Sequence, residues 1–328
     1  MMMARVLLLA PCVMSPKPLC YWGPPGPTCG PYCETCGPGH ETCGPSLDGP
    51  RFHVADDSCG TQDPNAPVYD PLHGVYHLFW QAHTARPCAG DFKAAPSIGH
   101  AVSRDLVRWA HLPVAIWNGG DGAYDADAIY SCSATLVDGV PTIVYPGLCE
   151  SSSWAGGLCK TWPGKGTTLG IATPANRSDP LSREWAKSAL NPIANRTTDA
   201  PSTAWRTAGG EWRFVTSGSG TNWVWSSRDF RSWTHVGNLS GFAGGACPSL
   251  FPMPPLTAGA GGELPAGATH VAKTSLGTAP GPSHMQDVFM LGKYTDGAPG
   301  TTGEWKSLQR RRTSTAASCS LARTCGTR

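Results

Sequence analysis

Short hydrophobic runs alternate with polar, Gly- and Pro-rich turns from residue 51 to about residue 305. Two examples are Thr142-Ile143-Val144-Tyr145 and Trp212-Arg213-Phe214-Val215-Thr216. Both have the length of a strand and are rich in β-branched or aromatic residues. Few stretches carry a long helical pattern. The alternation therefore predicts one all-β domain, built from many short strands separated by turns.

A seven-residue segment that ends in Trp occurs twice in this domain. Residues 103–109 recur as residues 227–233, and shorter echoes stand at 182–185 and 303–305. One such turn in each unit of several strands is typical of the stacked blades of a β-propeller. Ordinary hairpin turns with surface tryptophans are the simpler alternative. The agreement between the two longer copies favours the propeller.

Two flanking segments lack the strand pattern. Residues 1–50 are rich in Cys, Pro and Gly with a degenerate Cys-Gly-Pro repeat, and we predict a disordered leader that builds no core. Cys33 and Cys36, with His40 and Cys43 nearby, would allow a zinc knuckle. Irregular spacings and the lack of a second CxxC favour a low-complexity tract, so no metal site is predicted. Residues 306–328 are basic and are predicted to form a disordered tail.

Composition and charge narrow the function classes. The formal net charge of +2 gives no basic stripe for phosphate, which argues against a nucleic-acid partner. The first apolar run, residues 6–10, is too short for a membrane span and is a weak match to a secretory signal peptide. Fourteen cysteines are unusual in a cytosolic enzyme. Sequons at Asn176, Asn195 and Asn238 agree with a secreted, cell-wall or vacuolar location.

One carboxylate stands out because of its position. Asp63 lies in Gln62-Asp63-Pro64-Asn65, ahead of a strand-like segment that ends in Gln81. An Asp-Pro-Asn sequence alone is a common turn, since Asp and Asn bond their own backbone and Pro fixes φ. A carboxylate at the head of a buried strand, with polar side chains nearby, also suits a nucleophile that faces a sugar ring.

These segments, in this order, closely resemble the catalytic domain of glycoside hydrolase family 32, the invertases and fructan hydrolases. The resemblance covers residues 51 to about 297 and implies a five-bladed β-propeller. Recognisable sequence stops near Tyr294, so we expect the last blade to be missing. No C-terminal β-sandwich is evident. A leader (1–50), a propeller (51–305) and a tail (306–328) make up the expected organisation.

The resemblance also implies a reaction and a set of site residues. Family members hydrolyse β-fructofuranosides with retention, using two carboxyl groups about 5–5.5 Å apart. Asp63 falls on the nucleophile, while Gln62 and Gln81 fall on sugar-contacting positions. Tyr130 and Ser131 open a segment that resembles a further sugar-binding motif, although Ser131 is equally well read as an ordinary strand residue. No cofactor is implied, and the partner is a small carbohydrate.

Two family motifs are degenerate in this chain. The spacing from Pro201 to Trp205 puts Ala200 where the family has an Asp that binds fructose hydroxyls. A one-residue bulge would let Asp199 act as the transition-state stabiliser instead. In Ala246-Cys247-Pro248, Ala246 replaces the acid/base glutamate. Glu150 and Glu211, in a loop and a turn, are not expected to replace it, and His77 and His100 are interpreted as packed or turn residues.

Three hypotheses follow from these residues. The first is a β-fructofuranosidase-like hydrolase of sucrose or fructans, with activity weakened or lost through Ala246. The second is a non-catalytic propeller that binds fructosides or regulates another protein, and the third is an incomplete reading of a longer gene. A related propeller family acting on arabinosides stays open, although the order of motifs favours fructosides. Oligomeric state is not indicated.

Overall fold

The computed structural model describes the central part of the chain. The described residues are 54, 61–82, 96–149, 159–164, 166–197, 200–218, 220–242, 244–253, 266–277, 285–308 and 312–313. They form antiparallel strands and contain no helix, so the prediction of an all-β protein is confirmed. None of them belongs to a helix that could cross a membrane. The predicted leader and most of the predicted tail lie outside the described residues.

Four sheets follow one another along the chain, and we call them blades 1 to 4. Blade 1 contains β1 (Thr61–Asp70), β2 (Val75–Ala82), β3 (Ser97–Ser103) and β4 (Ala110–Ile116). Blade 2 contains β5 (Ala128–Ile129), β6 (Ser133–Val137), β7 (Val140–Cys149), β8 (Gly166–Pro174), β9 (Trp185–Lys187) and β10 (Ala194–Thr197). Blade 3 contains β11 (Trp205–Arg206), β12 (Trp212–Ser217), β13 (Asn222–Ser227) and β14 (Thr234–Asn238). Blade 4 contains β15 (Ala246–Pro252), β16 (His270–Gly277), β17 (Met285–Thr295), β18 (Glu304–Ser307) and β19 (Arg312–Thr313).

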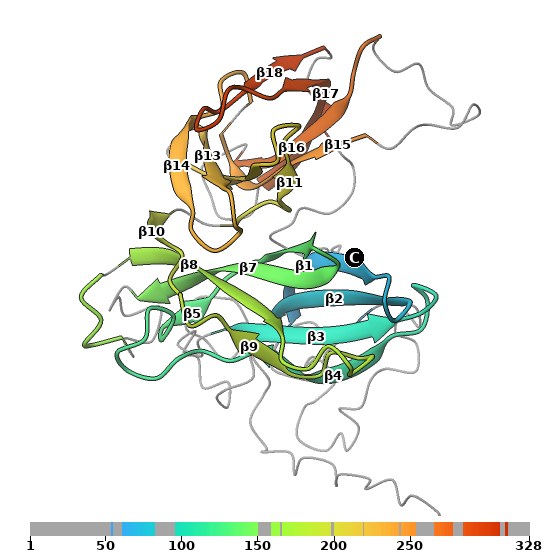
Figure 1. Ribbon diagram of the computed structural model, residues 1–328, viewed down its shortest axis with the longest axis vertical. Coiled ribbons are helices and arrows are strands. Elements are labelled where there is room, and N and C mark those ends of the chain that lie inside the picture. Colours follow the sequence, from blue (N-terminus) through green and yellow to red (C-terminus); the bar gives the residue numbers. More distant parts are fainter. Residues whose placement is uncertain are drawn as a thin grey trace, which may run out of the picture.

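Hydrophobic cores lie between successive blades. Phe79 and Ile98 of blade 1 pack with Ile143 of blade 2, and a second cluster joins blade 2 to blade 3. A third cluster packs Val224 of blade 3 against Met290 of blade 4. Figure 1 shows the two halves of the chain as separate groups of sheets, blue to green below and orange to red above. Face-to-face packing of successive sheets is that of a β-propeller.

The number of blades differs from the prediction. Four blades are present in the described residues, and the expected total of five is not confirmed. The predicted domain boundary at residue 305 falls inside β18, and two short stretches of the predicted tail pair with β17.

The repeated Trp-ending segment is the turn before the outer strand of a blade. In both full copies the Ser and Asp side chains accept hydrogen bonds from backbone N–H groups of the turn. Leu106 and Phe230 take the left-handed conformation, with φ of 61° and 62°. Trp109 and Trp233 each donate from Nε1 to the carbonyl of that residue at 3.2 Å. The repeat thus marks one structural position in two blades, as predicted.

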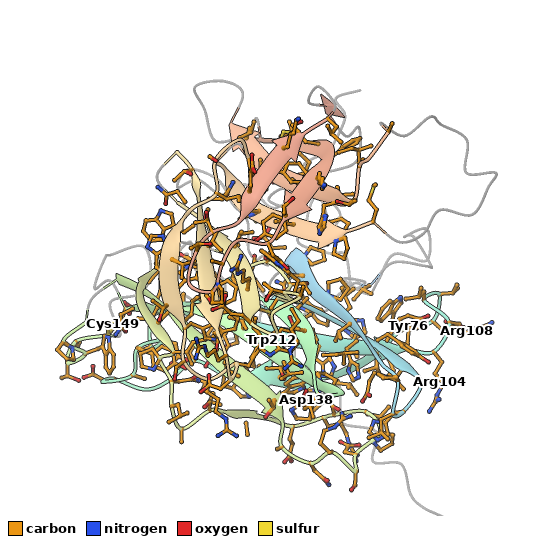
Figure 2. All side chains as sticks on the ribbon, turned by 45° about the horizontal axis from the view of Figure 1, so that its top comes forward. Tyr76, Arg104, Arg108, Asp138, Cys149 and Trp212 are labelled. Atoms are coloured by element: carbon orange, nitrogen blue, oxygen red, sulfur yellow. A yellow bond between two sulfur atoms is a disulfide. The ribbon has the colours of Figure 1, made fainter. Side chains whose placement is uncertain are left out.

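The same turn is buried in blade 3 and exposed in blade 1. Phe230 is 3% exposed and packs edge-on against Trp212, whereas Leu106 is 54% exposed. Tyr76 occupies the position of Trp212, because each pairs with the first Ser of its turn. Figure 2 shows Trp212 near the centre of the molecule and Tyr76 at its edge. The face of blade 1 that corresponds to the buried face of blade 3 is therefore left open by the described residues.

This contrast gives a stability prediction with a built-in control. Leu106→Gly should stabilise the protein by about 0.5–1 kcal/mol, because it removes left-handed strain at a side chain that buries little surface. Phe230→Gly, at the same φ, should cost roughly 3–5 kcal/mol because a buried aromatic ring is lost. Urea unfolding of both variants measures the difference. If the unfolding free energy changed in the same direction in both variants, strain at Leu106 would be contradicted.

A pair of buried histidines lies in blade 1. Nδ1 of His77 is 2.9 Å from Nε2 of His100, and the ring of Phe79 stacks on His100. Both side chains are almost fully buried, which confirms their interpretation as packed residues. Burial lowers the pKa of His77 to about 4, although Asp70 opposes the shift. Burial and the neighbouring His77 also hold the pKa of His100 well below its usual range.

Acid should therefore destabilise the fold. The unfolded chain binds a proton at each histidine near pH 6.5, whereas the folded His77 resists protonation down to about pH 4. Its contribution is complete above pH 6.5 and is lost as the pH falls from 6.5 to 4, by roughly 3 kcal/mol. Urea unfolding at several pH values should show this slope, and His77→Gln/His100→Gln should flatten it. If the pH dependence also flattens in the exposed His111→Gln variant, it does not arise from the His77–His100 pair.

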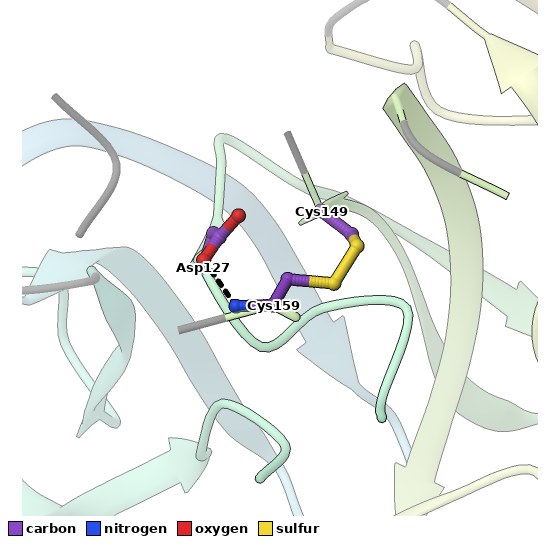
Figure 3. A group of neighbouring side chains, drawn as sticks. All are labelled: Asp127, Cys149 and Cys159. Carbon is purple, nitrogen blue, oxygen red and sulfur yellow. Dashed lines mark hydrogen bonds between the residues drawn. A yellow bond between two sulfur atoms is a disulfide. The ribbon is translucent and has the colours of Figure 1, made fainter. Parts of the chain in front are cut away.

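A disulfide lies at the end of β7. It joins Cys149 to Cys159, and Oδ1 of Asp127 accepts the backbone N–H of Cys159 at 2.8 Å, as Figure 3 shows. The three side chains lie close enough for a metal ion, but both sulfur atoms are already bonded to each other. Structural disulfides are typical of oxidising compartments, which agrees with the cysteine-rich composition.

Candidate active site

Asp63 lies in an irregular part of β1. The pairing of β1 with β2 shifts register on both sides of Asn65, and Asp63 and Ala66 have φ of 48° and 47°. Pro64 has no N–H for the ladder, which favours an irregularity at this point. Bulges of this kind change the direction of a side chain and are common beside active sites. Here the result is a carboxylate that meets side chains from two other elements.

Three predicted site residues form one hydrogen-bonded group. Nε2 of Gln81 donates to Oδ2 of Asp63 at 2.9 Å, and the Ser131 hydroxyl donates to the same oxygen at 3.0 Å. Gln81 also donates to Oγ of Ser131 at 2.8 Å. Gln81 and Ser131 are 7% and 5% exposed, so both donors are largely shielded from water. Hydrogen bonds to a carboxylate are charge-assisted, and these two fix its orientation.

Asn65 links this group to the next motif. Its Nδ2 donates to the backbone carbonyl of Asp63 at 2.7 Å, and its Oδ1 accepts from Sγ of Cys132 at 2.9 Å. The side chain thereby ties the left-handed backbone of Asp63 to the segment that carries Ser131. Sequence reasoning did not assign Asn65 a role. The Asp-Pro-Asn sequence could have indicated this role, because Asn in such a turn forms hydrogen bonds with the local backbone.

The other predicted binding residues are placed less fully. Gln62 pairs with Gln81 through the backbone, and its side chain lies outside the described residues. Tyr130 is half-buried, and its backbone N–H donates to the carbonyl of Pro146 at 3.0 Å. Asp199 falls outside the described residues.

The four motifs lie in or beside the strand that begins each blade. Asp63 is near the start of β1, Ser131 lies between β5 and β6, which both pair with β7, Ala200 precedes β11, and Ala246 opens β15. The blades of a propeller surround a central channel, so these positions belong to one end of it. Ala200 and Cys247 are also left-handed, with φ of 38° and 49°. Such conformations cost about 1–3 kcal/mol each and cluster at functional sites.

A polar row crosses blade 4 beside Ala246. Ala246 pairs with Ser275, and Ser275 pairs with Asp287 on the next strand. The Ser275 hydroxyl donates to Oδ1 of Asp287 at 2.5 Å, and Nζ of Lys273 lies 3.1 Å from Oδ2. Sequence reasoning recognised these two strands but not this row, because its members are 41 positions apart at their widest. A side chain placed at 246 would therefore meet a polar, charge-balanced neighbourhood.

Glu211 is excluded as a proton donor by its contacts. Oε2 of Glu211 accepts from the buried guanidinium of Arg213 at 3.0 Å. Burial opposes ionisation, but hydrogen bonds from Ser226, Arg213 and the backbone of Gly300 lower the pKa of Glu211. Arg213 in turn donates to the hydroxyl of Tyr294, joining blade 3 to blade 4. Glu211 is an ionised structural residue, as its turn position suggested. Glu150 lies outside the described residues.

Comparisons with known proteins show similarity to one family. Residues 53–312 match the model of the glycosyl hydrolases family 32 N-terminal domain. The chain is 34% identical over 261 residues to the β-fructofuranosidase insoluble isoenzyme 6 of Oryza sativa subsp. japonica, covering 71% of this chain and 39% of that protein. It is 34% identical over 257 residues to the β-fructofuranosidase cell wall isozyme of Zea mays, covering 72% and 39%.

A solved structure has a similar fold. The fructan 1-exohydrolase IIa of Cichorium intybus, crystallised as a variant in complex with 1-kestose, superposes with a TM-score of 0.55 at 29% identity. The match covers 74% of this chain and 44% of that one. The chain spans about two-fifths of the length of the curated relatives described above. On the extent of the family match, the order of its motifs and the propeller fold, the chain belongs to glycosyl hydrolase family 32.

Proposed function

We propose that this chain is a β-fructofuranosidase-like glycoside hydrolase whose nucleophile is Asp63 and whose activity on sucrose or fructans is weak. The observation that carries the proposal is the Asp63 carboxylate, bonded to Gln81 and Ser131 at one end of the propeller. Gln62 and Tyr130 complete the fructosyl site in this proposal. Relatives named as β-fructofuranosidases, and one bound to 1-kestose, support a fructoside as substrate.

The reaction would proceed in two displacements. A carboxylate oxygen of Asp63 attacks the anomeric carbon of the fructosyl unit, and the bond to the leaving oxygen breaks. Water then releases fructose from the ester. In this family scheme a second carboxylic acid protonates the leaving oxygen and later takes a proton from water. Ala246 has no proton to give, so a sucrose or fructan leaving group would depart as a poorly stabilised alkoxide.

A second function is favoured by the same substitutions. Ala200 and Ala246 both stand where the family has acids, while the Asp63 group keeps its hydrogen bonds. A propeller with a fructosyl pocket and without the proton donor would bind fructosides and release them unchanged.

Two measurements on the same protein separate these functions. Fructose release from sucrose, inulin and levan is followed beside calorimetric titration with each sugar. The hydrolase proposal expects slow but measurable release that depends on Asp63. Saturable binding with no release above the rate of an Asp63→Asn variant would establish the binding function instead. Absence of both binding and release would contradict the fructosyl site itself.

We also propose a five-bladed propeller and a secreted or cell-wall location. In blade 1, Leu106 is exposed at the position where blade 3 buries Phe230 against its neighbour, and Phe251 is 43% exposed on blade 4. Two open apolar faces support the presence of one further blade between them. The disulfide, the exposed sequon residues Asn176, Asn195 and Asn238, and relatives named as insoluble or cell-wall enzymes support the location.

A further inference from the structure

A cavity of about 210 Å³ lies between blades 3 and 4. Its lining residues are Trp205, Arg206, Pro252, His270, Tyr294 and Asp296. Pro252 ends β15, whose first residue is Ala246. At about 3.3 Å per residue the two ends of this strand lie roughly 20 Å apart. The cavity therefore lies at the end of β15 opposite to Ala246.

Aromatic rings form its walls. Trp205 and Tyr294 meet edge to face with centroids 5.4 Å apart, and His270 meets Tyr294 at 5.6 Å. Tyr294 is 7% exposed, and its hydroxyl both accepts from Arg213 and donates to the carbonyl of Thr302. The wall is thus held in place by hydrogen bonds from both blades, which prepares it for a ligand without reorganisation.

Polar groups around these rings are also held in place. Nε of Arg206 donates to the carbonyl of Gly210 at 3.1 Å, and its guanidinium lies over the ring of Trp212. Oδ2 of Asp296 accepts the backbone N–H of Ala208 at 2.9 Å.

One donor in this wall has no partner within the part of the chain that the structure describes. Nε1 of Trp205 is buried there and meets no acceptor.

We propose that this cavity binds one neutral sugar unit of a carbohydrate chain. The rings offer apolar faces to the C–H groups of a sugar, while Arg206 offers donors and Asp296 an acceptor to its hydroxyls. The cavity is smaller than the roughly 300–1,000 Å³ of drug-sized sites, which suits one ring rather than an oligomer. Arg206 and Asp296 carry opposite charges, so the lining has no excess charge to attract an anionic sugar.

The state of His270 agrees with a neutral ligand. Burial lowers the pKa of His270, although Asp296 opposes the shift, so the imidazole is uncharged at neutral pH. Its Nδ1 lies 2.8 Å from the Thr269 hydroxyl. A second site of this kind would hold a polymer at the protein and raise its effective concentration at the candidate active site. This inference does not depend on turnover at Asp63.

The test uses an Asp63→Asn protein, in which the sugars are not hydrolysed during the titration, and the Trp205 resonance reports the second site alone. 1-Kestose and sucrose are titrated while the indole N–H resonances are recorded, and the resonance missing from Trp205→Phe identifies Trp205. We expect this resonance to shift with millimolar saturation. Arg206→Gln should weaken binding at least about tenfold, and Asp296→Asn should also weaken it. Arg231→Gln, an exposed arginine of the same blade, is the matched control and should leave binding unchanged.

Three outcomes would overturn the proposal. The first is a Trp205 resonance that does not move with either sugar. The second is binding that is unchanged in both Arg206→Gln and Asp296→Asn. The third is tighter binding of galacturonic acid than of sucrose, which would assign the cavity to anions. Fructose release by the unmodified chain is measured separately, so failure at this cavity leaves the Asp63 proposal untouched.

Discussion

Ala246→Glu is expected to raise the rate of fructose release from sucrose by roughly 10²–10⁴-fold, the usual contribution of a positioned general acid. The new carboxyl would stand at the start of β15, beside Ser275 and the Lys273–Asp287 ion pair. Its proton would go to the leaving oxygen, whose departure is the step that the natural chain leaves unassisted. Initial rates of fructose release measure the effect.

The leaving group provides the control for this prediction. Fructosyl fluoride needs little protonation to depart, so Ala246→Glu should accelerate its hydrolysis much less than that of sucrose. Ala246→Gln has nearly the same size and cannot donate a carboxylic proton, and it should give no comparable gain. Equal acceleration of both substrates, or an equal gain in Ala246→Gln, would mean that the substitution improves packing or binding rather than proton transfer.

Asp63→Asn in the Ala246→Glu protein should lower fructose release by about three orders of magnitude or more, because removing a nucleophile abolishes the covalent route. The amide keeps the shape of the side chain but cannot form the ester. Ser131→Ala should have a smaller effect, since it removes only one of the two donors to Oδ2. Steady-state rates of the single and double variants compare these losses.

Asp138→Asn is a matched control for this loss. Asp138 is exposed in the turn between β6 and β7 and has a φ of 49°, almost equal to the 48° of Asp63. The same substitution at the same backbone conformation should therefore leave the rate unchanged. A loss in Asp138→Asn as large as that in Asp63→Asn would point to folding, not chemistry, as its cause.

Short motifs that resemble those of the family predicted one part of the site. Asp63, Gln81 and Ser131 were predicted to lie together, and they form one hydrogen-bonded group. The repeated Trp-ending segment likewise predicted a turn before an outer strand, because its Ser, Asp and Trp make their bonds within seven residues. The turn depended on a spacing that is fixed along the chain, whereas the Asp63 group joins residues up to 68 positions apart and was predicted through the family resemblance.

Other features depend on pairing between distant strands. Ser275 and Asp287 become neighbours of Ala246 only through the register of β15, β16 and β17, which no local pattern fixes. The buried Arg213 was missed for the same reason, since its partner Tyr294 lies in the next blade. The role of Asp199 stays a prediction. So does the fifth blade, because the described residues contain four.

The left-handed backbone at Ala200 and Cys247 bears on how such a site is regained. Alanine is a poor occupant of this conformation, whereas aspartate tolerates it better. The main chain at Ala200 thus retains a conformation that its present side chain does not favour, while Ala246 precedes the left-handed Cys247 and lies beside Ser275. Alanine codons differ from those of aspartate and glutamate by one base. One base change in each of the codons for Ala200 and Ala246 would therefore restore both acidic side chains on the existing backbone.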